Sequence, residues 1–278
     1  MLRYALNCSI MLRDHPVRDR LAIAADAGFA GVEFWWPFDS ATPDAEAVDD
    51  FVSAVTDGPL PLIALNLYAG DMPNGDRGII SWPGRESEVE ASALIAREIA
   101  ARTGVSHFNA LYGNRLSAHP STEQDAVARH TLRLAADILA DAGHVLVEAV
   151  SGADRYPLRG ADDVVAVLDE VAGNGGPDLG LLFDMYHLAA NGDDVESALA
   201  RHMGRIQHVQ VADAPGRGAP GTGTLPLSEW VEALETAGYR GWVAFEHLEP
   251  AGTPQPSLAP GITRTALRPS EPAPPPDR

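Results

Sequence analysis

The chain has 278 residues, of which 45% are hydrophobic and 21% are charged, as in soluble globular proteins and unlike disordered or fibrous ones. Its formal net charge of −19 would repel phosphate backbones and anionic membranes, so we expect neither nucleic acid nor a membrane as a partner. A single cysteine, Cys8, excludes an intrachain disulfide and, together with the absence of an apolar leader, predicts a cytoplasmic protein.

Short apolar segments alternate with amphipathic segments along most of the chain. Strands are predicted at Tyr4–Cys8, Gly31–Trp35, Pro61–Leu67, His107–Leu111, Val145–Glu148, Leu179–Asp184, Ile206–Val211 and Trp242–Glu246. Helices are predicted at Val17–Ala27, Ala45–Val55, Glu86–Thr103, Thr122–Ala142, Asp162–Ala172, Val195–His202 and Leu227–Ala237. Strands that alternate with helices in this way, over about 250 residues, predict a single (β/α)8 TIM barrel.

Three local features add to this alternation. The polar loop from Ala69 to Arg85 follows a strand, so we expect it to form a lid or wall over the barrel mouth. Ser121 begins a sequence typical of a helix capping box. Eight of the 22 prolines lie in residues 251–278, which predicts a barrel domain over residues 1–250 followed by a flexible, proline-rich tail.

Four of the predicted strands end in a side chain that carries oxygen. These residues are Glu148, Asp184, Gln210 and Glu246. One acidic residue at a strand end is more often a helix cap than a ligand, but the carboxyl ends of parallel barrel strands meet at one mouth. The four side chains together therefore predict a site for a hard divalent cation, Mg²⁺ or Mn²⁺.

A cation with open positions could bind a small substrate that has adjacent carbonyl and hydroxyl oxygens, and would acidify the neighbouring C–H bond. Glu148 and Glu246 would then serve as the proton carriers, one removing a proton from carbon and the other returning it to the adjacent carbon. His187 follows Asp184 by three residues and is a candidate to orient a substrate oxygen; the alternative is a packed histidine at a helix start. Arg217 lies in a glycine-rich loop where barrels often bind anions, and its guanidinium suits a carboxylate.

Several motifs resemble the hydroxypyruvate isomerase family, within the xylose isomerase-like barrels. They lie at Ala25–Phe34, Asn66–Asp71, Arg77–Ile79, Pro83–Glu86, Phe183–His187 and His208–Arg217. The resemblance implies interconversion of hydroxypyruvate and tartronate semialdehyde, or reaction of a related 2-oxo sugar acid. It assigns acid-base catalysis to Glu148 and Glu246, and metal binding to these two residues with Asp184 and Gln210.

The chain departs from the family pattern in the loop after the seventh strand. Gly218, Ala219 and Thr224 replace a histidine and two glutamates, which leaves an isomerase or epimerase of a larger keto sugar, or a sugar-acid-binding barrel without turnover, as alternatives. The expected partner is a small 2-oxo hydroxy acid, and a homo-oligomer remains open. A nuclease of the same superfamily would need more histidine ligands and a basic groove, which the acidic composition disfavours.

Overall fold

The structure is a computed structural model, and it describes residues 2–248. Its strands are β1 (Arg3–Asn7), β2 (Gly31–Phe34), β3 (Leu62–Asn66), β4 (His107–Asn109), β5 (His144–Glu148), β6 (Gly180–Asp184), β7 (Ile206–Val211) and β8 (Trp242–Phe245). Each pairs in parallel with the next, and β8 pairs with β1, so the sheet closes into a barrel in chain order. The predicted (β/α)8 fold is confirmed.

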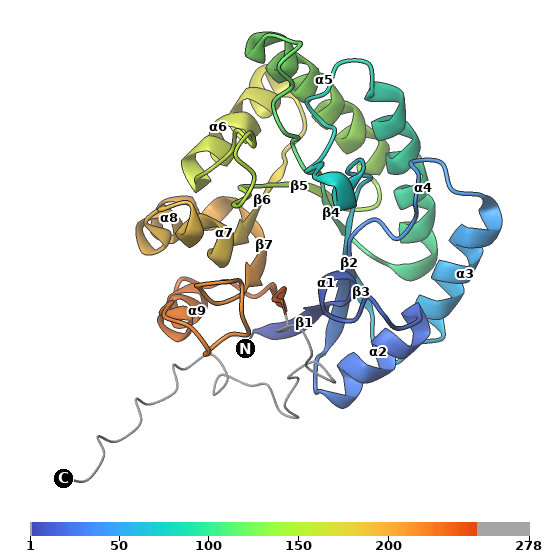
Figure 1. Cartoon of the computed structure of the whole chain (residues 1–278), viewed down its shortest axis with the longest axis vertical. Coiled ribbons are helices and arrows are strands. Elements are labelled where there is room, and N and C mark those ends of the chain that lie inside the picture. Colours follow the sequence, from blue (N-terminus) through green and yellow to red (C-terminus); the bar gives the residue numbers. More distant parts are fainter. Residues whose placement is uncertain (1, 249–278) are drawn as a thin grey trace.

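Helices surround the barrel (Figure 1). The α-helices are α1 (Cys8–Met11), α2 (Val17–Asp26), α3 (Ala45–Thr56), α4 (Glu86–Thr103), α5 (Ser121–Leu139), α6 (Ala161–Ala172), α7 (Met185–Ala190), α8 (Val195–His202) and α9 (Leu227–Thr236). Short 3-10 helices lie at Met72–Asn74, Gly173–Gly175 and Met203–Arg205. Within residues 2–248, none of the helices combines the length and the apolar character that crossing a bilayer requires.

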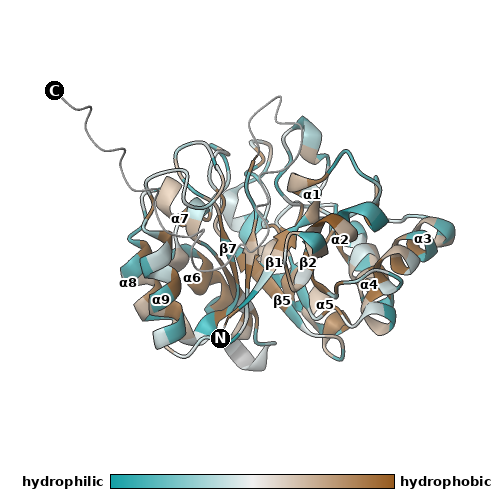
Figure 2. Ribbon diagram, turned by 90° about the horizontal axis from the view of Figure 1, so that it is seen from below, coloured by the Kyte–Doolittle hydropathy of each residue, from teal (hydrophilic) through white to brown (hydrophobic). Residues whose placement is uncertain are grey.

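The helices pack because apolar residues recur on one face. In α3, the residues Val48, Phe51, Val52 and Val55 are buried, the spacing that places side chains on one side of a helix. Hydrophobic colour accordingly concentrates on the strands and on the inward faces of the helices, whereas hydrophilic residues cover the outside (Figure 2). This packing leaves the two ends of the barrel to the connecting loops.

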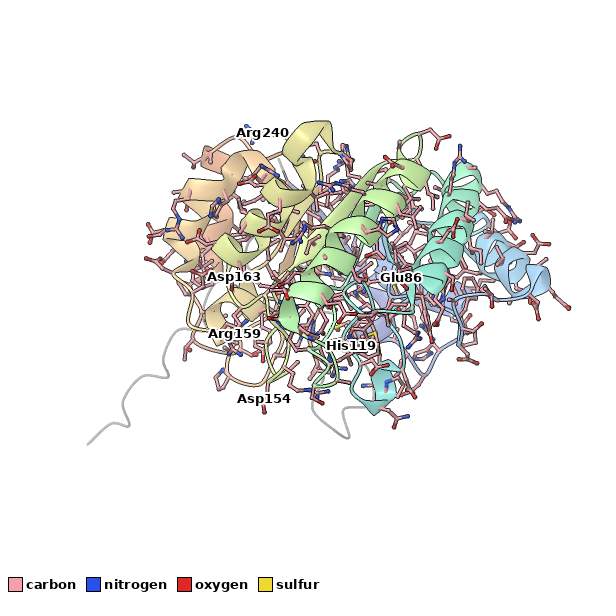
Figure 3. The ribbon with its side chains drawn as sticks, turned by 90° about the horizontal axis from the view of Figure 1, so that it is seen from above. Glu86, His119, Asp154, Arg159, Asp163 and Arg240 are labelled. Carbon is pink, nitrogen blue, oxygen red and sulfur yellow. The ribbon has the colours of Figure 1, made fainter. Side chains whose placement is uncertain are left out.

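Loops at the two ends of the barrel have different roles. His119 and Asp154 follow strands β4 and β5 and lie at one rim of the molecule, whereas Arg240 precedes β8 and lies at the opposite rim (Figure 3). The first rim contains the carboxyl ends of the strands, where TIM barrels carry their active sites.

The loop from Ala69 to Arg85 forms a fixed wall at that rim. Ile79, Ile80 and Trp82 are buried, and Gly78 forms an antiparallel bridge with Tyr112. Gly78 has a φ of 100°, and a Cβ there would lie 1.9 Å from the carbonyl oxygen of Leu111. Only glycine tolerates both conditions, so this loop is held tightly against the end of β4.

Some local predictions were wrong. Cys8 opens α1 instead of closing β1, because the side chain of Asn7 accepts hydrogen bonds from the backbone N–H groups of Ser9 and Ile10 and starts a helix. Helix α5 begins after Pro120 and has no side-chain cap, so the predicted capping box does not form. The proposed tail at residues 251–278 lies outside the described residues.

Candidate active site

A cavity of about 1000 Å³ opens at the carboxyl ends of the strands. Glu148, His187, Arg217 and Glu246 line it, together with the aromatic side chain of Trp35. Four of the six predicted site residues therefore come together at one mouth, although they are spread over almost 100 residues of sequence. A second cavity, of about 550 Å³, lies at the opposite end of the barrel and contains none of them.

Glu148 is the last residue of β5 and is buried. Its Oε1 accepts a hydrogen bond from Nδ2 of Asn109 at 2.7 Å. Burial raises the pKa of Glu148 well above its ordinary value, and the negative charges of Glu246 and Asp184 raise it further. Burial, and after it the neighbouring carboxylates, thus give Glu148 a raised proton affinity.

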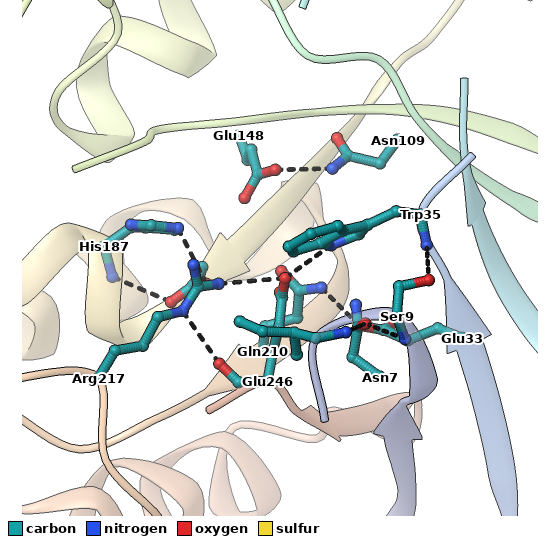
Figure 4. A network of polar contacts seen from close by, with 12 residues as sticks. Asn7, Ser9, Glu33, Trp35, Asn109, Glu148, His187, Gln210, Arg217 and Glu246 are labelled. Carbon is teal, nitrogen blue, oxygen red and sulfur yellow. Dashed lines mark hydrogen bonds and ion pairs between the residues drawn. The ribbon is translucent and has the colours of Figure 1, made fainter. Parts of the chain in front are cut away.

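Glu246 directly follows β8, and its backbone N–H continues the ladder by donating to the carbonyl of Val211 at 3.1 Å. Its Oε1 accepts from Nε1 of Trp35 at 2.9 Å and lies 3.1 Å from Nη2 of Arg217 (Figure 4). Burial raises the pKa of Glu246 to about 8, against the opposing effect of Arg217. At neutral pH this carboxyl can therefore either hold or release a proton.

The two carboxylate oxygens of Asp184 make different contacts. Its Oδ1 caps α7 by accepting from the backbone N–H of His187 at 2.9 Å, while its Oδ2 lies 3.8 Å from Nη2 of Arg217 and 3.7 Å from Nε2 of His187. The strand-to-helix turn at Asp184 therefore aims one carboxylate oxygen into the site and uses the other for the cap.

The hydrogen bonds of His187 define its tautomer. Its Nδ1 accepts from the backbone N–H of Ser151 at 3.0 Å and lies 2.8 Å from Oγ of the same residue. Burial lowers the pKa of His187 to about 4, so the ring is neutral at physiological pH. Because Nδ1 must keep its lone pair to accept, the hydrogen resides on Nε2, which faces the site as a donor.

Gln210 lies on β7, beside Asp184 of β6 in the parallel register. Its Nε2 donates to Oε1 of Glu33 at 2.6 Å. Its Oε1 is buried and has no hydrogen-bond partner within residues 2–248. Since buried polar atoms normally have partners, this oxygen is free to accept from or coordinate a ligand.

These donors fit a hard divalent cation. Three carboxylates, Glu148, Asp184 and Glu246, are buried close together with the unpartnered amide oxygen of Gln210, and a cation would offset their mutual repulsion. Ligand atoms of Glu148, Asp184 and His187 also lie within 4.8 Å of one another. We exclude His187 from the ligand set, because its Nε2 carries hydrogen as long as Ser151 donates to Nδ1.

A single buried carboxylate organises the loop between β7 and α9. Asp213 accepts four backbone hydrogen bonds, from Ala214, Gly221, Gly223 and Leu225. The loop presents Arg217, which adopts a left-handed φ of 58° and donates from Nε to the carbonyl of Glu246 at 3.0 Å. The predicted anion-binding arginine thus contacts carboxylates of the protein itself.

Sequence reasoning missed several residues of this site. Glu33, Trp35 and Asn109 each hydrogen-bond a predicted ligand, and Ser151 orients His187. The strand-end criterion would have flagged Asn109 only if the end of β4 had been predicted correctly, because the predicted strand ran on to Leu111. No local signal marks Trp35 or Ser151, because their partners lie 211 and 36 residues away in sequence.

Comparison with known proteins identifies the family. Residues 21–266 match the model of the xylose isomerase-like TIM barrel family. The chain belongs to this family. The match covers most of the chain, and the closed barrel of β1–β8 is the architecture that the family name describes.

Relatives within the xylose isomerase-like family are named as isomerases of small acids. A Streptomyces coelicolor protein, named provisionally as a hydroxypyruvate isomerase, is 44% identical over 253 residues, covering 88% of this chain and 90% of its own. A 2-oxo-tetronate isomerase of Cupriavidus necator is 32% identical over 256 residues, covering 91% and 95%. The protein is therefore an isomerase that acts on a small molecule, as the sequence predicted.

A solved structure from Brucella melitensis, described as an AP endonuclease of family 2, has a TM-score of 0.80 and 28% identity, covering 96% of this chain and 97% of its own. This similarity supports the closed barrel that residues 2–248 form. The acidic charge of −19 gives no support for a nucleic-acid substrate here.

Proposed function

We propose that the protein is a metal-dependent aldose-ketose isomerase that interconverts hydroxypyruvate and tartronate semialdehyde. The observation that carries the proposal is the pair of buried glutamates, Glu148 and Glu246, which have raised pKa values, lie beside Asp184 and line one cavity. Two such groups can exchange protons with a substrate in both directions. In this proposal Glu148, Asp184, Gln210 and Glu246 hold Mg²⁺ or Mn²⁺.

A bound divalent cation would polarise the substrate carbonyl and acidify the adjacent C–H bond. One glutamate removes a proton from C3 of hydroxypyruvate, and the electron pair forms the C2–C3 double bond of an enediolate. The other glutamate delivers a proton to C2 while the proton of the C3 hydroxyl group passes to the C2 oxygen, which leaves an aldehyde at C3 and a hydroxyl group at C2. The interaction between Glu148 and Glu246 supports this division, because ionisation of one carboxyl favours the protonated form of the other.

Two further residues would bind the substrate. The Nε2–H group of His187 would donate to a substrate oxygen, since its tautomer is held by Ser151. Arg217 lines the cavity, and its guanidinium would bind the substrate carboxylate. Because Arg217 lies 3.1 Å from Glu246, a carboxylate bound there would lie close to the proposed proton carriers.

The test is a coupled assay with purified protein, in which a reductase specific for tartronate semialdehyde reports its formation from hydroxypyruvate in the presence of Mg²⁺ or Mn²⁺. Treatment with a chelator should abolish turnover, and added cation should restore it. Glu148→Gln should lower kcat by roughly 100-fold or more, whereas Glu170→Gln, on the surface with 58% of its side chain exposed, is the matched control. Full activity in Glu148→Gln would remove this residue from the mechanism.

A larger 2-oxo sugar acid is a second candidate substrate. The cavity of about 1000 Å³ is large for a three-carbon acid, and Gly218 and Ala219 replace larger side chains of the family pattern in the adjoining loop. The similarity to the Cupriavidus necator 2-oxo-tetronate isomerase favours a four-carbon acid within this class. Comparing kcat/KM for three-carbon and four-carbon 2-oxo acids separates the two candidates.

We also propose that the protein works in the cytoplasm, on the basis of its single buried cysteine and acidic charge.

Hydrogen exchange distinguishes an isomerase from a barrel that only binds sugar acids. An active isomerase should exchange the C3 hydrogen of hydroxypyruvate with solvent in D₂O, and a binding protein should not.

A further inference from the structure

Glu33 is a buried carboxylate in the barrel interior to which the proposed function assigns no role. It lies in the middle of β2 and is 2% exposed. Its Oε1 accepts from Nδ2 of Asn7 at 2.9 Å and from Nε2 of Gln210 at 2.6 Å (Figure 4). Its Oε2 lies 2.6 Å from Nε2 of His208, the third donor. A buried charge with this many donors is held in one place.

The contact with Gln210 determines which way its amide points. A carboxylate can only accept hydrogen bonds, so it draws the NH₂ group of Gln210 toward itself. The amide oxygen lies on the other branch of the same planar group and must point away from Glu33. That oxygen is one of several buried side-chain atoms without a hydrogen-bond partner within residues 2–248, and Gln210 adjoins Asp184 in the sheet.

Without Glu33, either end of the Gln210 amide could face the site. An NH₂ group in that position would repel a cation, whereas the oxygen would bind it. We propose that Glu33 is a positioning residue that holds the oxygen of Gln210 toward the divalent cation. This inference rests on the proposed function, since it assumes that Gln210 is a ligand.

The surrounding residues explain why Glu33 itself does not turn. Asn7 is fixed because its Oδ1 also caps α1, accepting from the N–H groups of Ser9 and Ile10. His208 is fully buried on β7, two residues before Gln210 and on the same face of the strand. Both oxygens of Glu33 are thereby held by donors from β1 and β7.

The test is the affinity for Mn²⁺, measured on the metal-free protein by electron paramagnetic resonance titration, without reference to turnover. Glu33→Met removes the acceptor with little change in volume and should raise the Kd for Mn²⁺ about 10- to 100-fold, as expected for a residue that orients a ligand. His208→Gln keeps an N–H donor for Oε2 of Glu33 and is the control for disturbance of the barrel interior; it should bind Mn²⁺ as the wild type does.

A double-mutant cycle separates orientation from a general structural effect. In Gln210→Glu, both side-chain oxygens are equivalent, so there is no orientation to lose, and adding Glu33→Met should not weaken Mn²⁺ binding further. An equal loss of affinity in both backgrounds would overturn the inference. If Glu33→Met does not fold, as judged by circular dichroism, Glu33→Asp serves instead, since it keeps the charge and withdraws it from Gln210; wild-type affinity in that variant would also overturn the inference.

Gln210→Met distinguishes failure of this inference from failure of the proposed function. Weak Mn²⁺ binding by Gln210→Met, together with wild-type affinity in Glu33→Met, would show the positioning role alone to be wrong. If Gln210→Met binds Mn²⁺ as tightly as the wild type, the proposed ligand set is wrong and the inference fails with it.

Discussion

Asp213→Asn tests how the loop between β7 and α9 is held. Oδ1 of Asp213 accepts from the N–H groups of Ala214 and Leu225, and Oδ2 accepts from those of Gly221 and Gly223, at 2.9–3.0 Å. Asparagine retains one oxygen and places an NH₂ group against two N–H donors. Two hydrogen bonds to a charged group are lost, each contributing about 1.5–3 kcal/mol, so the loop should lose about 3 kcal/mol or more of local stability.

Loss of order in this loop should lower activity because the loop positions Arg217. Its left-handed φ of 58° is unfavourable for a side chain with a Cβ, and the ordered loop maintains it. A loosened loop should misplace the guanidinium and lower kcat/KM about 100-fold in the coupled assay. Hydrogen exchange should show faster exchange across residues 214–225, whereas Asp178→Asn, at an 89% exposed position, should change neither quantity. Unchanged exchange and kcat/KM in Asp213→Asn would refute the reasoning.

Three further predictions concern His107, His187 and Gly78. Burial, with His208 and His144 nearby, lowers the pKa of His107 to about 4; the unfolded chain takes up a proton as pH falls below 6.5 and the folded chain does not. Neutral His107 therefore contributes stability above pH 6.5 that is lost toward pH 4, about 3 kcal/mol in total. In urea unfolding, the free energy of unfolding of His107→Gln should fall less steeply with decreasing pH than that of the wild type. His187→Leu should lower kcat about 100-fold by removing the Nε2–H donor, yet titration should show an unchanged affinity for Mn²⁺; a large loss of affinity would instead make His187 a ligand. Gly78→Ala should destabilise the fold by about 3 kcal/mol because its Cβ meets the Leu111 carbonyl, whereas Gly84→Ala, also at positive φ but with nothing within 4 Å, should lose only about 1 kcal/mol in thermal unfolding.

The alternation of strands and helices was predictable because it depends on local periodicity. Strand β6 is a short apolar run, and α3 repeats apolar residues at helical spacing. The secondary structure of each can therefore be predicted from a few consecutive residues. Boundaries were less certain where a polar side chain competes for backbone donors. Asn7 ends β1 one residue early for this reason, since its Oδ1 bonds the N–H groups of the next turn.

The positions of the site residues followed from the same periodicity together with one topological rule. Glu148, Asp184, Gln210 and Glu246 each lie at or near the end of a predicted strand, and parallel strands of a barrel end at one mouth. The sequence alone therefore determined the fold class and brought the four side chains to one rim.

Only the tertiary structure decided how these side chains are oriented. The bond from Trp35 to Glu246 and that from Gln210 to Glu33 join residues 211 and 177 positions apart. The tautomer of His187 depends on Ser151, which follows a different strand. These contacts depend on the register and tilt of a closed sheet, which no short stretch of sequence encodes, because hydrogen-bond partners at this distance are selected by the whole barrel.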